Sequence, residues 1–267
     1  MNPIQDGPVC PLFRPVTMRG KVALEALAGA GVSPQMAAAL PGAPRGRCVC
    51  WGIPFRVGRV VLVRERPVAV RFAPLRARQL VFLHTSDLRP MGPGPDGMVR
   101  APGGHGRLGE HAADYVILYA DGSERRAAIR RRHQVGAFSR GWGENCFEAV
   151  ADRKPHPLPA HPQESNPNLE WGRIQTRAAA GDMRQFLNWL WCWENPRPRA
   201  AIVGVRFEPV SGTLVVSGIA AQRVGRHPPR RDARHDQRAG HRGGAGGVQP
   251  AALAVASEGG PPPAGGA

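Results

Sequence analysis

Histidines and carboxylates gather near the middle of this 267-residue chain, where they could bind a metal ion or a polar ligand. Neutral imidazoles and carboxylates are usual ligands of zinc and other transition metals. No compact His-x-His or His-Glu-x-x-His motif joins these residues. We therefore expect most of them to cap strand ends and turns, with ligand contacts by some of them as the alternative. The set consists of His84, Asp87, His105, Glu110, His111, Asp114 and His133.

A stand-alone hydrolase is one alternative interpretation of this set. In that case His84, Asp87, His111 and His133 would hold a metal ion that activates water. The sequence contains no serine nucleophile elbow and no Walker-type phosphate loop. We assign no catalytic residue, no metal site and no cofactor, and we expect His84, Asp87 and His111 to contact a ligand if one binds here.

Three tryptophans lie at alternate positions, so a strand would place the indoles of Trp189, Trp191 and Trp193 on one face. An exposed row of indoles could stack against sugar rings. However, Leu190 and Cys192 make the opposite face apolar as well, which is typical of a buried central strand. Core packing is the preferred interpretation, and a sugar platform built on Trp189 and Trp191 is the alternative.

A predicted hairpin is basic, with Glu124-Arg125-Arg126 on one side and Arg130-Arg131-Arg132-His133 on the other. On a strand, Arg130 and Arg132 would lie on the same side. Two guanidinium groups placed in this way could hold a phosphate or carboxylate. We expect a solvated sheet face with internal ion pairs, and an anion site formed by Arg130 and Arg132 is the alternative.

The chain is strongly basic, with 36 lysines plus arginines against 20 aspartates plus glutamates and a net charge of +16. Only Lys21 and Lys154 are lysines, so nearly all of the positive charge comes from arginine. Arginine, glycine, alanine and proline share GC-rich codons, and base composition alone can enrich all four. We therefore expect no specific nucleic-acid partner, and arginine-mediated nucleic-acid binding is kept as an alternative.

No apolar run reaches the roughly 20 residues that a membrane-spanning helix needs. The first 15 residues also lack a basic segment followed by an apolar one, the pattern of a secretory signal. We expect no membrane partner and a cytoplasmic location. The oligomeric state is left open.

Short β-branched runs separated by turns predict the strands that must position these groups. The Asp121-Gly122 pair is a strong hairpin signal because glycine tolerates positive φ. Strands at this spacing favour an all-β fold, an antiparallel β-sandwich or jelly roll. The predicted strands lie at 60–63, 68–72, 79–83, 115–119, 127–131, 186–193, 201–207 and 213–219.

Composition divides the chain into three parts. Residues 1–47 form an N-terminal lead-in with short helices, and Ser33-Pro34 has the residue types of an N-cap and first helical position. Residues 48–224 form the predicted β-sandwich domain. Residues 225–267 are rich in arginine, glycine and proline, and we expect this tail to be disordered because it cannot bury enough apolar surface.

Seven short motifs lie along the predicted strands and turns. They are 51–58 (WGIPFRVG), 83–87 (LHTSD), 109–122 (GEHAADYVILYADG), 131–133 (RRH), 141–147 (GWGENCF), 193–196 (WENP) and 207–212 (FEPVSG). Together they resemble a bacterial β-sandwich module that precedes the catalytic region of CehA/McbA-type metallohydrolases, which carry a PHP-like domain. The resemblance covers roughly residues 50–217.

The resemblance implies a non-catalytic accessory module, with carbohydrate as the suggested ligand. PHP-like catalysis uses His-x-His and further His and Asp ligands, and this sequence has no His-x-His. No catalytic residue can therefore be carried over. The implied partners are a saccharide or a catalytic domain missing from this chain, and a frameshift or truncated gene model would explain the character of 225–267.

Overall fold

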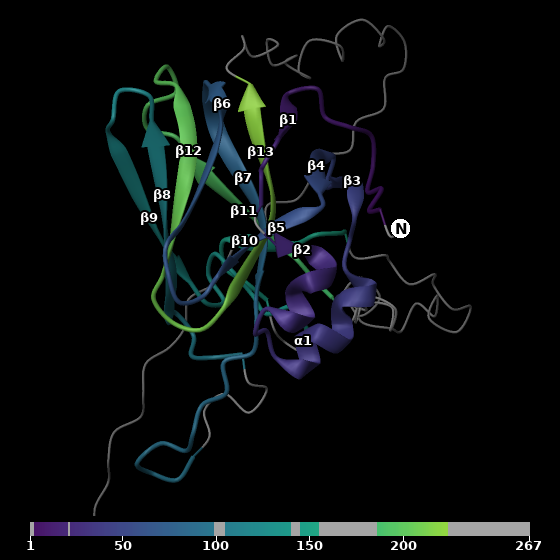
Figure 1. The fold of residues 1–267 in the computed structure, drawn as a ribbon, viewed down its shortest axis with the longest axis vertical. Coiled ribbons are helices and arrows are strands. Elements are labelled where there is room, and N and C mark those ends of the chain that lie inside the picture. The colour runs from purple at the N-terminus through teal and green to yellow at the C-terminus, as the bar shows by residue number, and fades with distance from the viewer. Residues whose placement is uncertain (1–2, 21, 99–104, 140–144, 155–185, 224–267) are drawn as a thin grey trace, which may run out of the picture. The chain divides into compact units, whose positions relative to one another are not determined.

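The computed structural model describes residues 3–20, 22–98, 105–139, 145–154 and 186–223. These residues form a predominantly β structure with antiparallel sheets, in agreement with the predicted all-β class (Figure 1). The tail at 225–267, predicted to be disordered, and most of the 141–147 motif lie outside the described residues. No helix within the described ranges is long and apolar enough to cross a membrane.

The larger sheet has seven strands, and all its strand pairs are antiparallel. Its two longest strands, β7 and β13, pair at its centre. Their register places Leu83 opposite Gly218 and Phe82 opposite Ile219. The order is β10 (Ala149–Ala151), β11 (Trp189–Glu194), β7 (Ala77–Ser86), β13 (Leu214–Arg223), β5 (Arg59–Val63) and β2 (Val22–Ala23), with β1 (Phe13–Val16) also on β13.

The smaller sheet has four strands in the order β6 (Val68–Leu75), β12 (Ile202–Pro209), β8 (His111–Tyr119) and β9 (Glu124–Arg130). The predicted Asp121-Gly122 turn joins β8 to β9, and Gly122 has φ +83°, as this turn requires. A separate hairpin pairs β3 (Gly46–Cys50) with β4 (Ile53–Val57).

One cluster of buried apolar side chains is shared by the two sheets. Phe82 of β7 lies 5.0 Å from Tyr115 of β8 between ring centroids, and Tyr115 lies 4.8 Å from Phe207 of β12. On the other side of β7, Val81 and Leu83 pack in a second cluster with side chains of β3 and β4. The strand predicted at 79–83 therefore lies in β7, and its residues Leu80 to Leu83 are buried on both faces.

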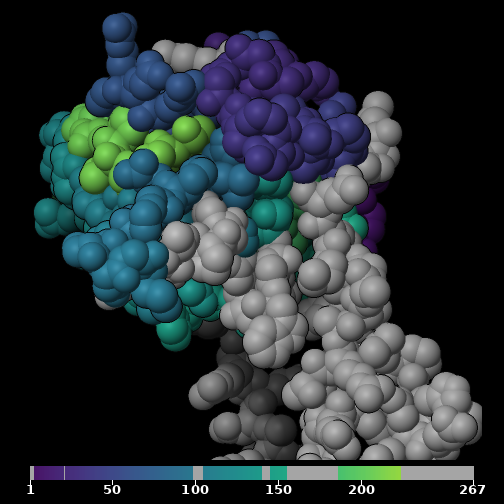
Figure 2. All heavy atoms as spheres, turned by 90° about the horizontal axis from the view of Figure 1, so that it is seen from below, coloured from purple at the N-terminus to yellow at the C-terminus, as the bar shows by residue number. Residues whose placement is uncertain are grey.

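The first 47 residues contain helical turns, but they are not a purely helical lead-in. The helical segments are η1 (Leu24–Gly29), α1 (Pro34–Ala39) and η2 (Leu40–Gly42). Ser33 caps α1, because its Oγ accepts a hydrogen bond from the Met36 amide at 3.1 Å. However, β1 and β2 of the same segment join the larger sheet. Figure 2 views the molecule from below relative to Figure 1. It shows the purple N-terminal segment beside the light-green chain around the β12–β13 turn.

Candidate functional site

His84, the first predicted ligand contact, is a fully buried residue of β7. Its Nε2 lies 2.9 Å from the carbonyl oxygen of Gln134, and its Nδ1 lies 2.7 Å from the Tyr115 hydroxyl. A carbonyl only accepts hydrogen bonds, so Nε2 carries the proton and Nδ1 accepts from Tyr115. Burial lowers the pKa of His84 to about 4, which keeps the ring neutral. His84 therefore connects the two sheets, and both ring nitrogens are occupied.

Asp87 follows β7 and is 3% exposed. Its carboxylate accepts hydrogen bonds from the Ser33 amide at 2.6 Å, the Ser33 hydroxyl at 2.5 Å and the Leu88 amide at 2.7 Å. Asp87 thus fixes the residue that caps α1. Its oxygens attach the helical segment to the end of β7, which is a structural role.

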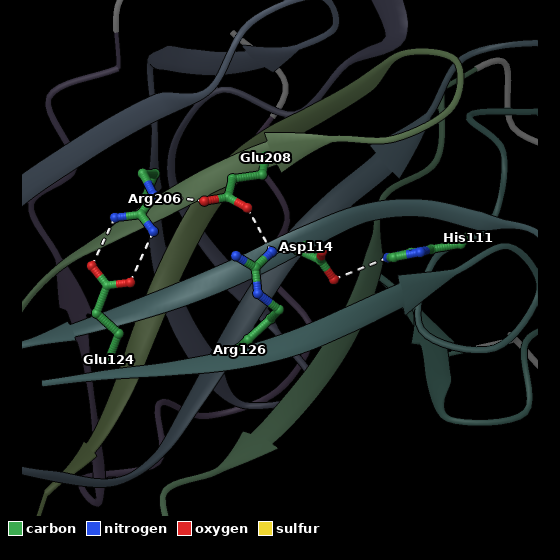
Figure 3. A network of polar contacts seen from close by, with 6 residues as sticks. All are labelled: His111, Asp114, Glu124, Arg126, Arg206 and Glu208. Carbon is green, nitrogen blue, oxygen red and sulfur yellow. Dashed lines mark hydrogen bonds and ion pairs between the residues drawn. The ribbon is translucent and has the colours of Figure 1, made fainter.

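His111 lies at the start of β8 and belongs to a charge network on the four-stranded sheet (Figure 3). Its Nε2 is 2.9 Å from Oδ1 of Asp114. The other oxygen of Asp114 accepts from Arg126 of β9 at 2.7 Å. The imidazole therefore faces a carboxylate that an arginine already shares.

The same network continues to β12 (Figure 3). Arg126 also donates to Glu208 at 2.5 Å, and Arg206 donates to Glu208 at 2.7 Å. The two terminal nitrogens of Arg206 meet both oxygens of Glu124 at 2.8 Å each, a bidentate pair. The hydrogen bonds from Arg206 lower the pKa of Glu124 and, together with Arg126, that of Glu208. This face confirms the expectation of a sheet surface with internal ion pairs.

The structure separates Arg130 from Arg132, which the sequence analysis placed on one strand face. Strand β9 ends at Arg130, whose amide donates to the Gln134 side chain at 2.8 Å. Arg132 has φ +62° in the following turn, so strand alternation does not reach it. His133 of the same turn lies 3.8 Å from Glu148 and contacts the ring of Phe147.

The sequence analysis missed Arg131, which is only 1% exposed. Its guanidinium lies 3.4 Å from Glu110 and donates to the carbonyl oxygen of Ser211 at 3.0 Å. Gly106 and Gly212, both at positive φ, leave space for this side chain, since a Cβ at either position would collide with it. Burial lowers the pKa of Arg131, and the charge of Glu110 opposes that shift.

Through these contacts Arg131 links three of the seven motifs found in the sequence, at 109–122, 131–133 and 207–212. The run of three arginines at 130–132 was the only signal in the sequence that pointed to this residue. Which arginine of the pair is buried could not be read from the sequence, because this depends on the turn after β9.

Trp189 and Trp191 lie in the core, 3% and 7% exposed. The indole nitrogen of Trp189 donates to the Ala137 carbonyl at 2.9 Å, and Trp191 stacks on Phe82 at 5.6 Å between centroids. Trp193 is partly buried against the same cluster. The shared face expected from the alternate spacing is present, but it points into the core, so Trp189 and Trp191 offer no stacking surface.

The predicted polar set is therefore dispersed among separate structural contacts. Among the residues that the structure describes, no group of three or more His, Cys, Asp or Glu side chains is placed to hold a metal ion.

A different group of residues lines a cavity of ≈ 860 Å³ where β6 and β13 end. The ends of these two strands lie in the upper part of Figure 1. Strand pairing brings the parts together, because Arg14 of β1 pairs with Ala221 and Arg223 pairs with Ala77 next to the β6–β7 turn. We call this cavity the arginine groove. Its lining residues are Arg14, Pro74, Leu75, Arg76, Arg199, Ala201 and Arg223.

The arginine groove carries positive charge without matching carboxylates. Within the described ranges, none of its four arginines has an ion pair, and all four side chains belong to exposed residues. A neighbouring cavity of ≈ 610 Å³ shares Arg199 and Ala201 with the groove. There, by contrast, Arg197 is paired with Asp121 at 2.6 Å.

Comparison with protein-family models and with curated proteins finds no match for this chain. No residue role can therefore be transferred from a relative through these comparisons. The structural contacts of the predicted polar residues and the charge of the arginine groove are the observations on which a function must rest.

Proposed function

We propose that this chain is a non-catalytic β-sandwich accessory module of a larger metal-dependent hydrolase, as the resemblance of its motifs implies. The observation that carries the proposal is the state of His84. This residue is the best-placed histidine for a site at a strand end, yet both its nitrogens hold core hydrogen bonds and its pKa is lowered to about 4.

The other members of the alternative metal set support the same proposal. Asp87 is bound to Ser33, His111 faces Asp114, and His133 lies beside Glu148. Each group has its own partner on a different part of the fold, so the four do not converge on one ion. A stand-alone metallohydrolase built on this set has no such support.

The ligand of the proposed module is a saccharide or the hydrolase's own catalytic domain. Trp189 and Trp191 are too deeply buried to stack on sugar rings. A sugar would instead contact the loops and strand ends that carry exposed polar groups. Carbohydrate binding of this kind would rely on hydrogen bonds and charge.

A metal-loading experiment tests the non-catalytic part of the proposal. The untagged protein is incubated with equimolar Zn²⁺ or Mn²⁺, desalted and measured by elemental analysis and for phosphodiester hydrolysis. We expect less than about 0.2 equivalents of metal and no turnover, since the described residues form no cluster that could hold the ion. About one equivalent of metal, lost in a His111→Ala, His133→Ala variant together with hydrolysis, would contradict the proposal.

The link to a hydrolase has its own test. The source gene is sequenced past codon 267, and all three reading frames are translated. A frame that encodes His-x-His ligands on alternating strands and helices supports the association. If every frame lacks them, the module is not part of such an enzyme.

A further inference from the structure

We propose that the arginine groove binds a compact polyanion, a small molecule with two or more carboxylate, phosphate or sulfate groups. This inference rests on the proposed function in that it names the ligand chemistry of a binding module. It depends on different residues from those that argue against a metal site.

The fold brings four positive charges together around the groove. Arg14, Arg76, Arg199 and Arg223 come from β1, the β6–β7 turn, the segment before β12 and the end of β13. Four guanidinium groups around one cavity repel each other, and no described carboxylate pairs with them. An anionic ligand would supply the missing opposite charge.

The lining and the volume of the groove also fit a small anionic molecule. Guanidinium groups donate two parallel hydrogen bonds to a carboxylate or a phosphate, which gives directional recognition of these groups. Between the arginines, Pro74, Leu75 and Ala201 give an aliphatic surface for the body of a ligand. A cavity of ≈ 860 Å³ has the size of small-molecule sites in proteins, about 300–1,000 Å³.

The lining of the groove suits a compact ligand better than a nucleic acid. No aromatic side chain lines the groove, so bases would find no stacking surface there. Several arginines beyond the groove are matched by carboxylates, as Arg197 is by Asp121 and Arg206 is by Glu124. The four groove arginines are gathered around one cavity, which suits a compact anion better than an extended phosphate backbone.

The chain's own tail is a poor occupant for this site. It follows directly after Arg223, but its sequence at 225–267 is itself basic, with six arginines against the carboxylates of Asp232, Asp236 and Glu258. Like charge disfavours its binding among four arginines. The ligand is therefore expected to come from outside the chain.

The test is calorimetric titration of the full chain with pyrophosphate and with citrate at low ionic strength. The groove variant is Arg76→Gln, Arg199→Gln. The matched control, Arg66→Gln, Arg107→Gln, removes the same charge at two exposed positions outside the groove. We expect saturable binding of at least one probe, weakened about tenfold or more by the groove variant because it loses charge-assisted hydrogen bonds, and less than about twofold by the control.

A second variant, Arg14→Gln, Arg223→Gln, repeats the test if the first pair does not fold, as checked by circular dichroism.

Titration with a sulfated disaccharide distinguishes the source of the anion. If the disaccharide binds more tightly than either probe and the groove variant loses this binding, the result supports the proposal and identifies an acidic sugar as the ligand. No binding of any probe at about millimolar concentration overturns the proposal.

Equal losses in the groove and control variants would also overturn it, since diffuse charge would then explain the binding. A single-stranded oligonucleotide that binds through the groove, when no small probe does, would assign the site to nucleic acid instead. Failure of the groove leaves the metal-loading result unchanged, and a bound metal would leave the groove titration unchanged, so the two proposals fail separately.

Discussion

The outer face of the four-stranded sheet and the arginine groove use the same residue type in opposite ways. On the sheet face, Arg126 and Arg206 each contact two carboxylates (Figure 3). In the groove, four arginines share one cavity and have no described carboxylate partner. The net charge of +16 is thus unevenly distributed over the fold.

Basic charge therefore has a structural role on the sheet face, whereas in the groove it is available for a ligand. The matched arginines link β8, β9 and β12, and their geometry is fixed by several hydrogen bonds. The groove arginines form no ion pair with any residue that the structure describes, and they repel each other. Codon bias can explain the number of arginines, but it does not explain why carboxylates accompany some of them and not others.

Acidification gives the largest expected effect, and its source is the core. The pKa of His84 is lowered from 6.5 to about 4, so the unfolded chain takes up a proton first as the pH falls. The contribution of His84 to the free energy of unfolding is complete above pH 6.5. It falls by about 3 kcal/mol as the pH is lowered from 6.5 to 4. Urea unfolding at a series of pH values measures this loss.

A His84→Gln variant is the control for this prediction, because it keeps a polar side chain that does not titrate. Its free energy of unfolding should depend less on pH between 6.5 and 4 than that of the wild type. The charge network responds in a lower window, since the pKa values of Glu124 and Glu208 are lowered and their stabilising effect disappears below about pH 4.5. Parallel curves for the two proteins would contradict the assignment of His84.

A smaller effect is expected from Arg206→Gln on the matched face. The change removes a bidentate pair with Glu124 and a hydrogen bond to Glu208. We expect a loss of about 1 kcal/mol in the free energy of unfolding, near the upper range for exposed pairs. Denaturant titration measures the loss, and 1 M NaCl should reduce it because salt screens exposed charges. Arg206→Lys should lose less free energy of unfolding than Arg206→Gln. An unchanged stability in Arg206→Gln would contradict a structural role for the matched arginines of the sheet face.

The smallest effect on stability is expected from Arg76→Gln, Arg199→Gln in the groove. These arginines have no described ion pair to lose, and their replacement relieves repulsion. The melting temperature should stay the same or rise slightly, with a change in the free energy of unfolding within about 0.5 kcal/mol. A clear loss of stability without ligand would show that the groove arginines are structural, and the contrast with Arg206 would disappear.

Strong local signals in the sequence predicted much of the sheet architecture. The apolar run at 79–83 and the Asp121-Gly122 turn lie in β7 and between β8 and β9, as expected. Strands β1, β2, β3, β4 and β10 were missed. They are short or contain proline, glycine or cysteine, and pairing with neighbours distant in sequence forms them, as when Phe13 pairs with Gln222.

The functional prediction was limited by burial. The His84 and Trp191 side chains have the right chemistry for ligand contacts, but only the packing of the two sheets decides that both lie inside. Conversely, the groove residues carry no local pattern, because Arg14 and Arg223 are more than 200 positions apart and meet only through the pairing of β1 with β13.

The sequence by itself determined the β class, the position of the central strands, the alternation of the tryptophans and the excess of arginine. These features depend on nearest neighbours and on composition, which the chain carries locally. Only the tertiary structure decided which polar groups are buried in the fold and which arginines meet carboxylates. The physical reason is that burial and charge pairing are set by strand partners distant in sequence, and the free energy of each ionisable group follows from those partners.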